Sequence, residues 1–205
     1  MSSLPNLDGR STALIVQGLQ NDVLAPGGAL VDPRLDAFMK KQNTLLHISE
    51  LADGLRAAGG MVIHVLYVVE ADGRGQPDTA PVFRRFRDSG AIRRGSWGVQ
   101  PFEGFPLAES DIVIEKCRVN PFYGSMLSSL LRGSGIRTVI PVGTQTNMGI
   151  VAAARHAADD GYEVLVPVDA VATQDEERQR ATIDYALANV STLVTTQEII
   201  KALTK

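Results

Sequence analysis

Six short apolar runs, rich in β-branched residues, alternate with longer helical patterns along this chain of 205 residues. Such short, nearly continuous apolar runs are typical of strands buried on both faces, as in a parallel sheet. Parallel neighbours need a crossover connection, which helices supply. The pattern therefore predicts an α/β fold, a three-layer α/β/α sandwich around a parallel sheet of about six strands. The runs are Thr12–Gln17, Met61–Val68, Asp111–Glu115, Arg137–Val142, Tyr162–Val166 and Ser191–Val194.

Apolar periodicity and glycine stops predict the helices between these strands. They are expected at about 34–58, 123–131, 147–160 and 176–189, with a short one after Thr196. The stretch Glu70–Pro106 breaks the rhythm and contains the basic run Arg84–Arg87. Long connections in compact domains are usually functional. No linker or repeat is visible, so we expect a single domain over residues 1–205.

Composition narrows the function classes. Hydrophobic residues make up 44% of the chain and charged residues 21%, which is ordinary for a globular protein. The net charge of −3 argues against a nucleic-acid partner. Cys117 is the sole cysteine, so an internal disulfide or a cysteine zinc site is not expected. No apolar run approaches the roughly 20 residues that span a bilayer. We expect a cytoplasmic protein without a membrane partner, metal or cofactor.

Open parallel sheets bind ligands beyond the carboxyl ends of their strands. Three of these ends have unusual sequences here, namely Gln17–Asp22, Glu115–Gly124 and Gly143–Gly149. The third segment opens a predicted helix, whose free N–H groups suit an anion or an oxyanion. A small-molecule site is therefore predicted where these segments meet.

The same three segments are similar to those of the isochorismatase-like superfamily, the cysteine hydrolases. The stretches are ALIVQGLQNDV, VIEKCRVNPFYGS and GTQTNMGIVAAARHAADDGYEVLVPVDA, and Gly95–Gly98 and Thr173–Glu177 also resemble family signatures. The resemblance covers about residues 11–202. It implies a Rossmann-like, six-stranded parallel sheet. It also implies hydrolysis of an amide or related C–N bond by a cysteine nucleophile, with an aspartate base and a lysine.

Carried over residue by residue, the resemblance is incomplete. Lys116 matches the family lysine, but the aspartate position falls on Gly18 and the cysteine position on Gly149. The segment Thr144-Gln145 matches the oxyanion loop, where the family geometry implies a cis peptide. Standard thiol-dependent amide hydrolysis is therefore not expected. The isochorismatase branch also lacks the cysteine, but it uses the aspartate as an acid, which glycine cannot replace.

Other residues have ordinary structural interpretations. Asp22 fits a loop or capping role, Cys117 a small buried apolar group, and His156 a core or surface position; His47 and His64 lack ligand spacing. Residues 67–72 contain no histidine, which disfavours the metal site of nicotinamidase-like relatives. The run Arg84–Arg87 fits a solvated face or a subunit contact, or recognition of a ligand carboxylate or phosphate. Lys116 either pairs with Glu115, Asp22 or Asp111, or faces a ligand, with a lowered pKa if it is buried.

Two hypotheses follow. The first is a hydrolase-like enzyme for a small molecule that uses Lys116 and an oxyanion-type loop without a thiol. The alternative is a catalytically inactive relative that binds a small ligand or serves as a structural or regulatory subunit. Relatives commonly form dimers or tetramers, so a homodimer or homotetramer is expected. The residues predicted to contact the ligand are Gln17, Gly18, Gln20, Trp97, Phe122, Thr144, Gln145 and Gly149.

Overall fold

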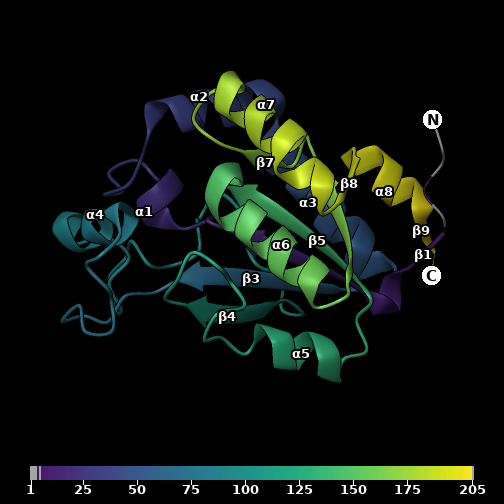
Figure 1. Ribbon diagram of the computed structural model, residues 1–205, viewed down its shortest axis with the longest axis horizontal. Helices are drawn as coiled ribbons and strands as arrows, with labels where there is room; N and C mark the ends of the chain where they lie inside the picture. Colours follow the sequence, from purple (N-terminus) through teal and green to yellow (C-terminus); the bar gives the residue numbers. More distant parts are fainter. Residues whose placement is uncertain (1–3, 5, 205) are drawn as a thin grey trace.

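A parallel sheet forms the middle of the protein in the computed structural model, which describes residue 4 and residues 6–204 (Figure 1). The strand order is β4-β3-β2-β5-β6-β8, and the short β7 pairs with β5. Every pairing in this sheet is parallel, which confirms the predicted architecture. The strands are β2 (Thr12–Gln17), β3 (Met61–Tyr67), β4 (Ile112–Lys116), β5 (Thr138–Thr144), β6 (Glu163–Pro167), β7 (Val171–Ala172) and β8 (Thr192–Val194).

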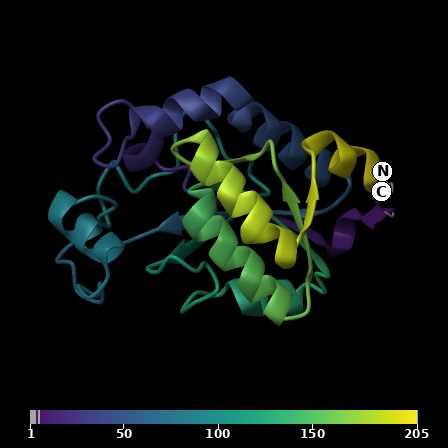
Figure 2. The ribbon, with the colours of Figure 1, turned by 45° about the horizontal axis from the view of Figure 1, so that its top comes forward.

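Helices cover both faces of the sheet. Alternate residues of the central strand point to opposite sides, and because both sets are apolar, each face needs a layer of helices to bury it. Leu14 and Val16 of β2 belong to one core cluster, and Ala13 and Ile15 belong to the other. The first core includes residues of α2 (Pro33–Gln42), α3 (Thr44–Ala57) and α8 (Thr196–Ala202). The second includes residues of α5 (Leu127–Gly133) and α6 (Val151–Asp159). Figure 2 shows α2 and α3 on one side of the sheet and α6 on the other, with α7 (Glu176–Tyr185) beside α6.

The ends of the described chain lie together. Two-residue strands, β1 (Leu7–Asp8) and β9 (Leu203–Thr204), pair in parallel, and a short 3-10 turn, η1 (Gly9–Ser11), leads into β2. In Figure 1 this pair lies at the end of the molecule opposite α1 (Asn21–Leu24) and α4 (Pro81–Ser89). Among the described residues, no helix has the length and apolar character that a membrane span requires.

Three of the predicted helices were wrong in their boundaries or continuity. The single helix expected over residues 34–58 is broken at Asn43, whose φ of 54° is left-handed, a conformation that asparagine tolerates. The helix expected from residue 123 begins only at Leu127. The helix expected over residues 176–189 ends at Tyr185 and is followed by a 3-10 turn, η3 (Leu187–Asn189).

The segment Glu70–Pro106 contains a helix that the sequence did not predict. Pro81 occupies the first turn of α4, where a missing N–H group is harmless, and Gly90 ends the helix in the left-handed conformation. No residue of α4 is fully buried. Figure 1 places the helix beyond the carboxyl end of β3, at the edge of the sheet where the parallel strands end.

The strand order also fixes where a ligand site forms. The chain builds β2, β3 and β4 toward one edge, and then returns to build β5, β6 and β8 on the other side of β2. The reversal lies between β2 and β5, where Gln17 pairs with Gly143 at the carboxyl ends of both strands. Open α/β sheets bind ligands in the crevice at such a point.

Candidate active site

A cavity of about 130 Å³ opens at this reversal point. Its lining residues come from the ends of β2, β4 and β5, from the segment after β5, and from α4. Six residues singled out in the sequence meet there: Gln17, Gly18, Lys116, Thr144, Gln145 and Gly149. The remaining wall is mainly apolar and includes Val23, Leu30, Val82, Phe86, Val119 and Met148. The arrangement suits a small ligand with an apolar body.

Lys116 is the last residue of β4, and its side chain is buried, with 7% of the residue exposed. Its Nζ donates to Gln17 Oε1 at 2.8 Å and to the carbonyl oxygen of Val119 at 3.0 Å. Both acceptors are uncharged. Burial without a counterion lowers the pKa of Lys116 to about 7. The amine is therefore part of the cavity and titrates near neutral pH.

The three carboxylates considered as partners of Lys116 are engaged elsewhere. Glu115 pairs with Arg94 at 2.6 Å, and Asp111 pairs with Arg56 at 2.7 Å. Asp22 accepts from the backbone N–H groups of Ala29 and Ile92. Within the described part of the chain, no carboxylate lies within ion-pair distance of Lys116 Nζ. The ion-pair interpretation of Lys116 was therefore wrong, and Asp22 has the loop role expected of it.

Gly18 and Gly149 differ in the space around them. Gly18 has a φ of 73°, and a side chain there would overlap Thr144 Oγ1. Thr144 Oγ1 also donates to the Gly18 carbonyl oxygen at 3.2 Å, so backbone and side chain are in close contact. At Gly149, a Cβ atom would lie 3.3 Å from Gln17 Oε1 and 3.7 Å from Lys116 Nζ. Position 149 thus faces the amine across a small open space, whereas position 18 has no room for a side chain.

The segment after β5 turns through Gln145, whose φ is 61°. No cis peptide bond occurs in the described residues, so the cis bond expected at Thr144-Gln145 was wrong. The left-handed conformation of Gln145 makes the turn instead. It leads into a π-helical turn, η2 (Thr146–Ile150), which continues as α6. The predicted helix over residues 147–160 therefore begins with a different helical geometry.

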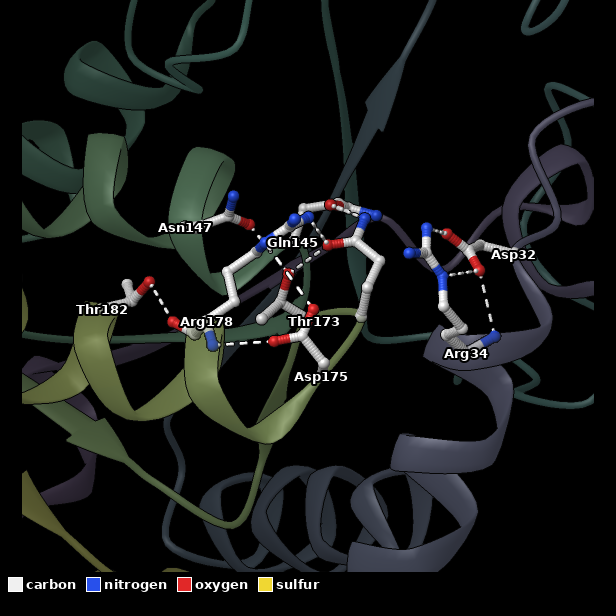
Figure 3. A network of polar contacts seen from close by, with 9 residues as sticks. Asp32, Arg34, Gln145, Asn147, Thr173, Asp175, Arg178 and Thr182 are labelled. Carbon is white, nitrogen blue, oxygen red and sulfur yellow. Dashed lines mark hydrogen bonds and ion pairs between the residues drawn. The ribbon is translucent and has the colours of Figure 1, made fainter.

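A polar network holds Gln145 in place (Figure 3). Gln145 Oε1 accepts from Gln174 Nε2 at 2.9 Å, and Gln174 Oε1 accepts from Arg178 Nη1 at 3.0 Å. Thr173 Oγ1 lies within hydrogen-bonding distance of Gln174 Oε1 (2.6 Å) and Asn147 Oδ1 (2.9 Å). The segment Thr173–Glu177 thus supports the loop of the site rather than the cavity itself.

Three residues predicted to contact the ligand lie outside the cavity lining. Gln20 is buried, and its side-chain amide bonds both the N–H and the C=O of Tyr67. Trp97 is 48% exposed, and its Nε1 donates to Glu103. Phe122 stacks on His156, with ring centres 4.5 Å apart. Ligand contacts for these three residues stay predictions, while the structure gives each a packing or hydrogen-bonding role.

Cys117 and the three histidines also lie outside the cavity lining. Cys117 is exposed, so the expectation of a buried apolar group was wrong: β4 is an edge strand whose side chains alternate, and Cys117 follows Val113 and Glu115 on the exposed side, opposite the buried Lys116. His64 is buried in β3 and bonds Asp111 at 3.0 Å, while His47 lies within ion-pair distance of Glu50. The described residues contain no group of three or more His, Cys, Asp and Glu side chains arranged to hold a metal.

Six lining residues lie outside the three strand-end segments in which the sequence predicted the site: Val23, Leu30, Tyr67, Val82, Arg85 and Phe86. Arg85 and Phe86 come from α4, which was predicted to be a loop. The basic run Arg84–Arg87 was the available signal, and one of its two interpretations was recognition of a ligand anion. Phe86 packs edge-on against Tyr67, with ring centres 4.8 Å apart, and this contact connects α4 to the end of β3.

The fold and the site define an α/β protein with a small-molecule cavity at the reversal point of a parallel sheet. The model of the isochorismatase domain matches residues 12–198 of the chain. The chain belongs to the isochorismatase family.

Named relatives agree with this assignment. The chain is 28% identical over 200 residues to the uncharacterized isochorismatase family protein YecD of Escherichia coli O157:H7, covering 96% of this chain and 98% of YecD. It is 30% identical over 202 residues to the ureidoacrylate amidohydrolase RutB of Methylobacterium radiotolerans, covering 91% of this chain and 75% of RutB.

Solved structures share the fold. A cysteine hydrolase from Pseudomonas syringae pv. phaseolicola 1448A superposes with a TM-score of 0.87 at 23% identity, covering 98% of this chain and 96% of that one. An isochorismatase family protein from Desulfovibrio vulgaris superposes with a TM-score of 0.81 at 28% identity, covering 96% of this chain and 100% of that one.

Proposed function

We propose that this protein is a hydrolase-like enzyme that acts on a small molecule without thiol chemistry, with Lys116 as its catalytic group. The observation that carries the proposal is the position of Lys116 Nζ, which is buried in the cavity and whose acceptors among the described residues are the uncharged oxygens of Gln17 and Val119. A neutral amine in such a place accepts a proton readily, and a pKa near the working pH is what a general base requires.

The proposed chemistry is attack of water on a carbonyl carbon or a related centre. Lys116 takes a proton from the water as its oxygen bonds to the substrate, and the resulting ammonium returns that proton to the leaving group. The negative charge on the substrate oxygen is stabilised by N–H groups at the beginning of η2, after Gln145, because the first N–H groups of a helix have no intrahelical partner. RutB is named an amidohydrolase, and the reaction types to test therefore include C–N bond hydrolysis.

The alternative is a relative without activity that binds a small ligand or serves as a structural or regulatory subunit. One observation favours it: the cavity has glycine at both position 18 and position 149, and its lining in the described part of the chain contains neither a thiol nor a carboxylate. The two proposals agree on the location of the ligand and differ only in whether turnover occurs.

The experiment is hydrolysis of a panel of small amides, ureides and activated esters, including nicotinamide and 4-nitrophenyl acetate. We expect turnover of at least one ester to survive both iodoacetamide and Cys117→Ser. Because a general base contributes about 10²–10⁴-fold, we expect Lys116→Met to lower the rate about 100-fold or more. Loss of turnover both in iodoacetamide-treated wild type and in untreated Cys117→Ser would show thiol chemistry and contradict the proposal. A folded wild-type protein that binds ligand without turnover would support the inactive alternative.

A further inference from the structure

Lys116 Nζ donates two hydrogen bonds to protein acceptors, which is the number that an uncharged amine can donate. An ammonium group carries three N–H donors, whereas a neutral amine carries two and has one lone pair. Nζ has two protein acceptors in the described residues, Gln17 Oε1 at 2.8 Å and the Val119 carbonyl oxygen at 3.0 Å. Both are neutral oxygens. With its two N–H groups used, a neutral Lys116 keeps a lone pair, and no donor among the described residues bonds to it.

The space beside this amine is open because position 149 is glycine. A Cβ atom at Gly149 would lie 3.7 Å from Nζ, so the amine borders the volume that a side chain would otherwise fill. Gln17 closes one side, since its Nε2 donates to the Gly149 carbonyl oxygen at 3.3 Å. A carbonyl carbon placed in this volume lies within reach of the lone pair.

We propose that Lys116 forms an imine with the carbonyl carbon of a small aldehyde or ketone bound in the cavity. The inference rests on the proposed function in one respect, the position of Lys116 as the reactive group of the cavity. In the reaction the lone pair of Nζ bonds to the carbonyl carbon, and the C=O oxygen leaves as water. Both hydrogens of that water are supplied by the amine nitrogen, and the C=N bond forms. No oxidant, reductant or metal is required.

The cavity determines which carbonyl compounds fit. Its volume of about 130 Å³ is close to that of an engineered apolar cavity of about 150 Å³ that admits benzene. Val82, Phe86 and Met148 supply apolar surface for the body of the ligand. An aldehyde with a single ring or a short branched chain is therefore the expected class, and benzaldehyde is a suitable probe.

The surroundings of the other lysines that the structure describes differ from those of Lys116. Lys40 and Lys41 are exposed and pair with Asp36 and Glu176, and Lys201 is exposed on α8. An exposed lysine has a pKa of about 10.4 and is almost entirely protonated at neutral pH. Burial keeps the pKa of Lys116 near 7, so a large share of its amine is unprotonated there. Selective reaction at one lysine is therefore expected.

The test is reductive trapping on the full chain at neutral pH with benzaldehyde and cyanoborohydride, followed by peptide mass mapping. We expect a benzyl group to accumulate on Lys116 at least about tenfold faster than on Lys40, Lys41 or Lys201. Equal labelling of Lys116 and the exposed lysines, or no label on Lys116, would overturn the proposal. Because the reaction is read by site in the wild-type protein, the result does not depend on any variant folding.

Two variants test the geometry. Gly149→Leu fills the space beside Nζ, and we expect it to slow labelling of Lys116 at least about tenfold, as exclusion from the site requires. The matched control is Gly133→Leu, because a Cβ at Gly133 meets nothing within 4 Å and its φ is not left-handed. Unchanged labelling in Gly149→Leu, with circular dichroism showing a folded protein, would count against the site.

The imine proposal and the hydrolase proposal fail separately. Trapping at Lys116 without any Lys116-dependent hydrolysis would support the imine and contradict the hydrolase proposal. Lys116-dependent hydrolysis without trapping at Lys116 would leave the amine as a base and contradict the imine.

Discussion

Lys116 Nζ and Gln17 Oε1 are 2.8 Å apart, although their strands, β4 and β2, are separated by β3 in the sheet. The contact joins an amine to an amide at a place where a carboxylate would give an ion pair. It explains why burial lowers the pKa of Lys116 without an opposing charge. The uncharged character of Gln17 therefore determines the chemistry available to Lys116.

Replacing Gln17 with glutamate is the direct test of this relationship. The two side chains have nearly the same shape, but a carboxylate within about 4 Å favours the ammonium form and raises a lysine pKa by about 1–3 units. We expect Gln17→Glu to move the midpoint of Lys116 labelling to higher pH and to slow labelling at pH 7. The measurement is the rate of benzaldehyde trapping at Lys116 as a function of pH.

The matched control is Gln197→Glu, which adds the same charge at an exposed position of α8, beside Glu50 and at the end of the molecule away from α4. We expect its labelling profile to match that of the wild type. A Gln17→Glu profile equal to that of the wild type would mean that Gln17 does not set the charge state of Lys116.

Replacement by alanine is expected to change the free energy of unfolding much more at Gly18 than at Gly149. Gly18 has a left-handed φ and its Cβ would overlap Thr144 Oγ1, so Gly18→Ala should lower the free energy of unfolding by about 1–3 kcal/mol or more. Gly149 has helical backbone, and a Cβ there meets no atom closer than Gln17 Oε1 at 3.3 Å, a contact that a shift of a few tenths of an ångström relieves, so Gly149→Ala should lie within about 1 kcal/mol of the wild type. Urea denaturation followed by circular dichroism measures both.

The same two positions are where the family resemblance implies a catalytic aspartate and a catalytic cysteine, which Gly18→Asp and Gly149→Cys would introduce. At Gly149→Cys the Cβ atom makes a close contact of 3.3 Å with Gln17 Oε1, whereas at Gly18→Asp the Cβ atom overlaps Thr144 Oγ1 unless Thr144 moves. We therefore expect the double variant to be destabilised and to lack amidase activity. Equal stability of Gly18→Ala and Gly149→Ala would remove the reason for this expectation.

The strands were predictable because continuous apolar runs depend on local sequence, and their ends lie within one or two residues of the predicted ones. The break at Asn43 was not predictable from the sequence. An asparagine is compatible with a continuing helix, and the left-handed turn forms there only when tertiary packing favours it. Helix α4 was not predicted because glycines and prolines around it are typical of a loop, although Pro81 and Gly90 mark the two ends of the helix. The family resemblance placed the partner of the lysine at position 18, which is glycine here, whereas the side chain that accepts a hydrogen bond from Lys116 is that of the preceding residue, Gln17. Contacts that reach across an intervening strand leave no spacing signal in the sequence.

Arg85 is the lining residue most suited to bind an anionic group of the ligand. Among the described residues it has no hydrogen bond or ion pair, and the neighbouring carboxylate of Asp32 already accepts from Arg34 Nε (3.1 Å) and Nη2 (2.8 Å), as Figure 3 shows. A hydrogen bond to a charged group contributes about 1.5–3 kcal/mol, so Arg85→Ala should weaken benzoate binding about 10- to 100-fold. Isothermal titration calorimetry measures the change.

Arg84 is the matched control, because it precedes Arg85 on α4 but donates to the carbonyl oxygens of Asp78 and Thr79 instead of lining the cavity. Arg84→Ala should bind benzoate as the wild type does, and neutral benzyl alcohol should bind all three proteins alike. Equal weakening by Arg84→Ala would indicate a general charge effect of the helix rather than a contact at Arg85.

Arg56 offers a comparison of buried and exposed ion pairs within one side chain. It contacts Asp111 at 2.7 Å and Asp53 at 2.8 Å, and the two carboxylate side chains are 1% and 73% exposed. Loss of one partner from a buried pair costs about 3–5 kcal/mol, whereas an exposed pair is worth about 0–1 kcal/mol. Asp111→Asn keeps the side-chain shape, so we expect a loss of about 2–4 kcal/mol, against less than about 1 kcal/mol for Asp53→Asn.

The pH dependence of this difference has a definite sign. Burial alone would raise the pKa of Asp111, but hydrogen bonds from Arg56, Ala108 N–H and His64 hold it below its ordinary value. A carboxyl group with a lowered folded-state pKa stabilises the protein fully above its unfolded pKa of about 3.9, and this contribution is lost as the pH falls through the folded-state value. The gap between wild type and Asp111→Asn in urea denaturation should therefore be largest near neutral pH and shrink in acid. A gap that stays constant with pH would show that the charge of Asp111 is not what stabilises this end of β3 and β4.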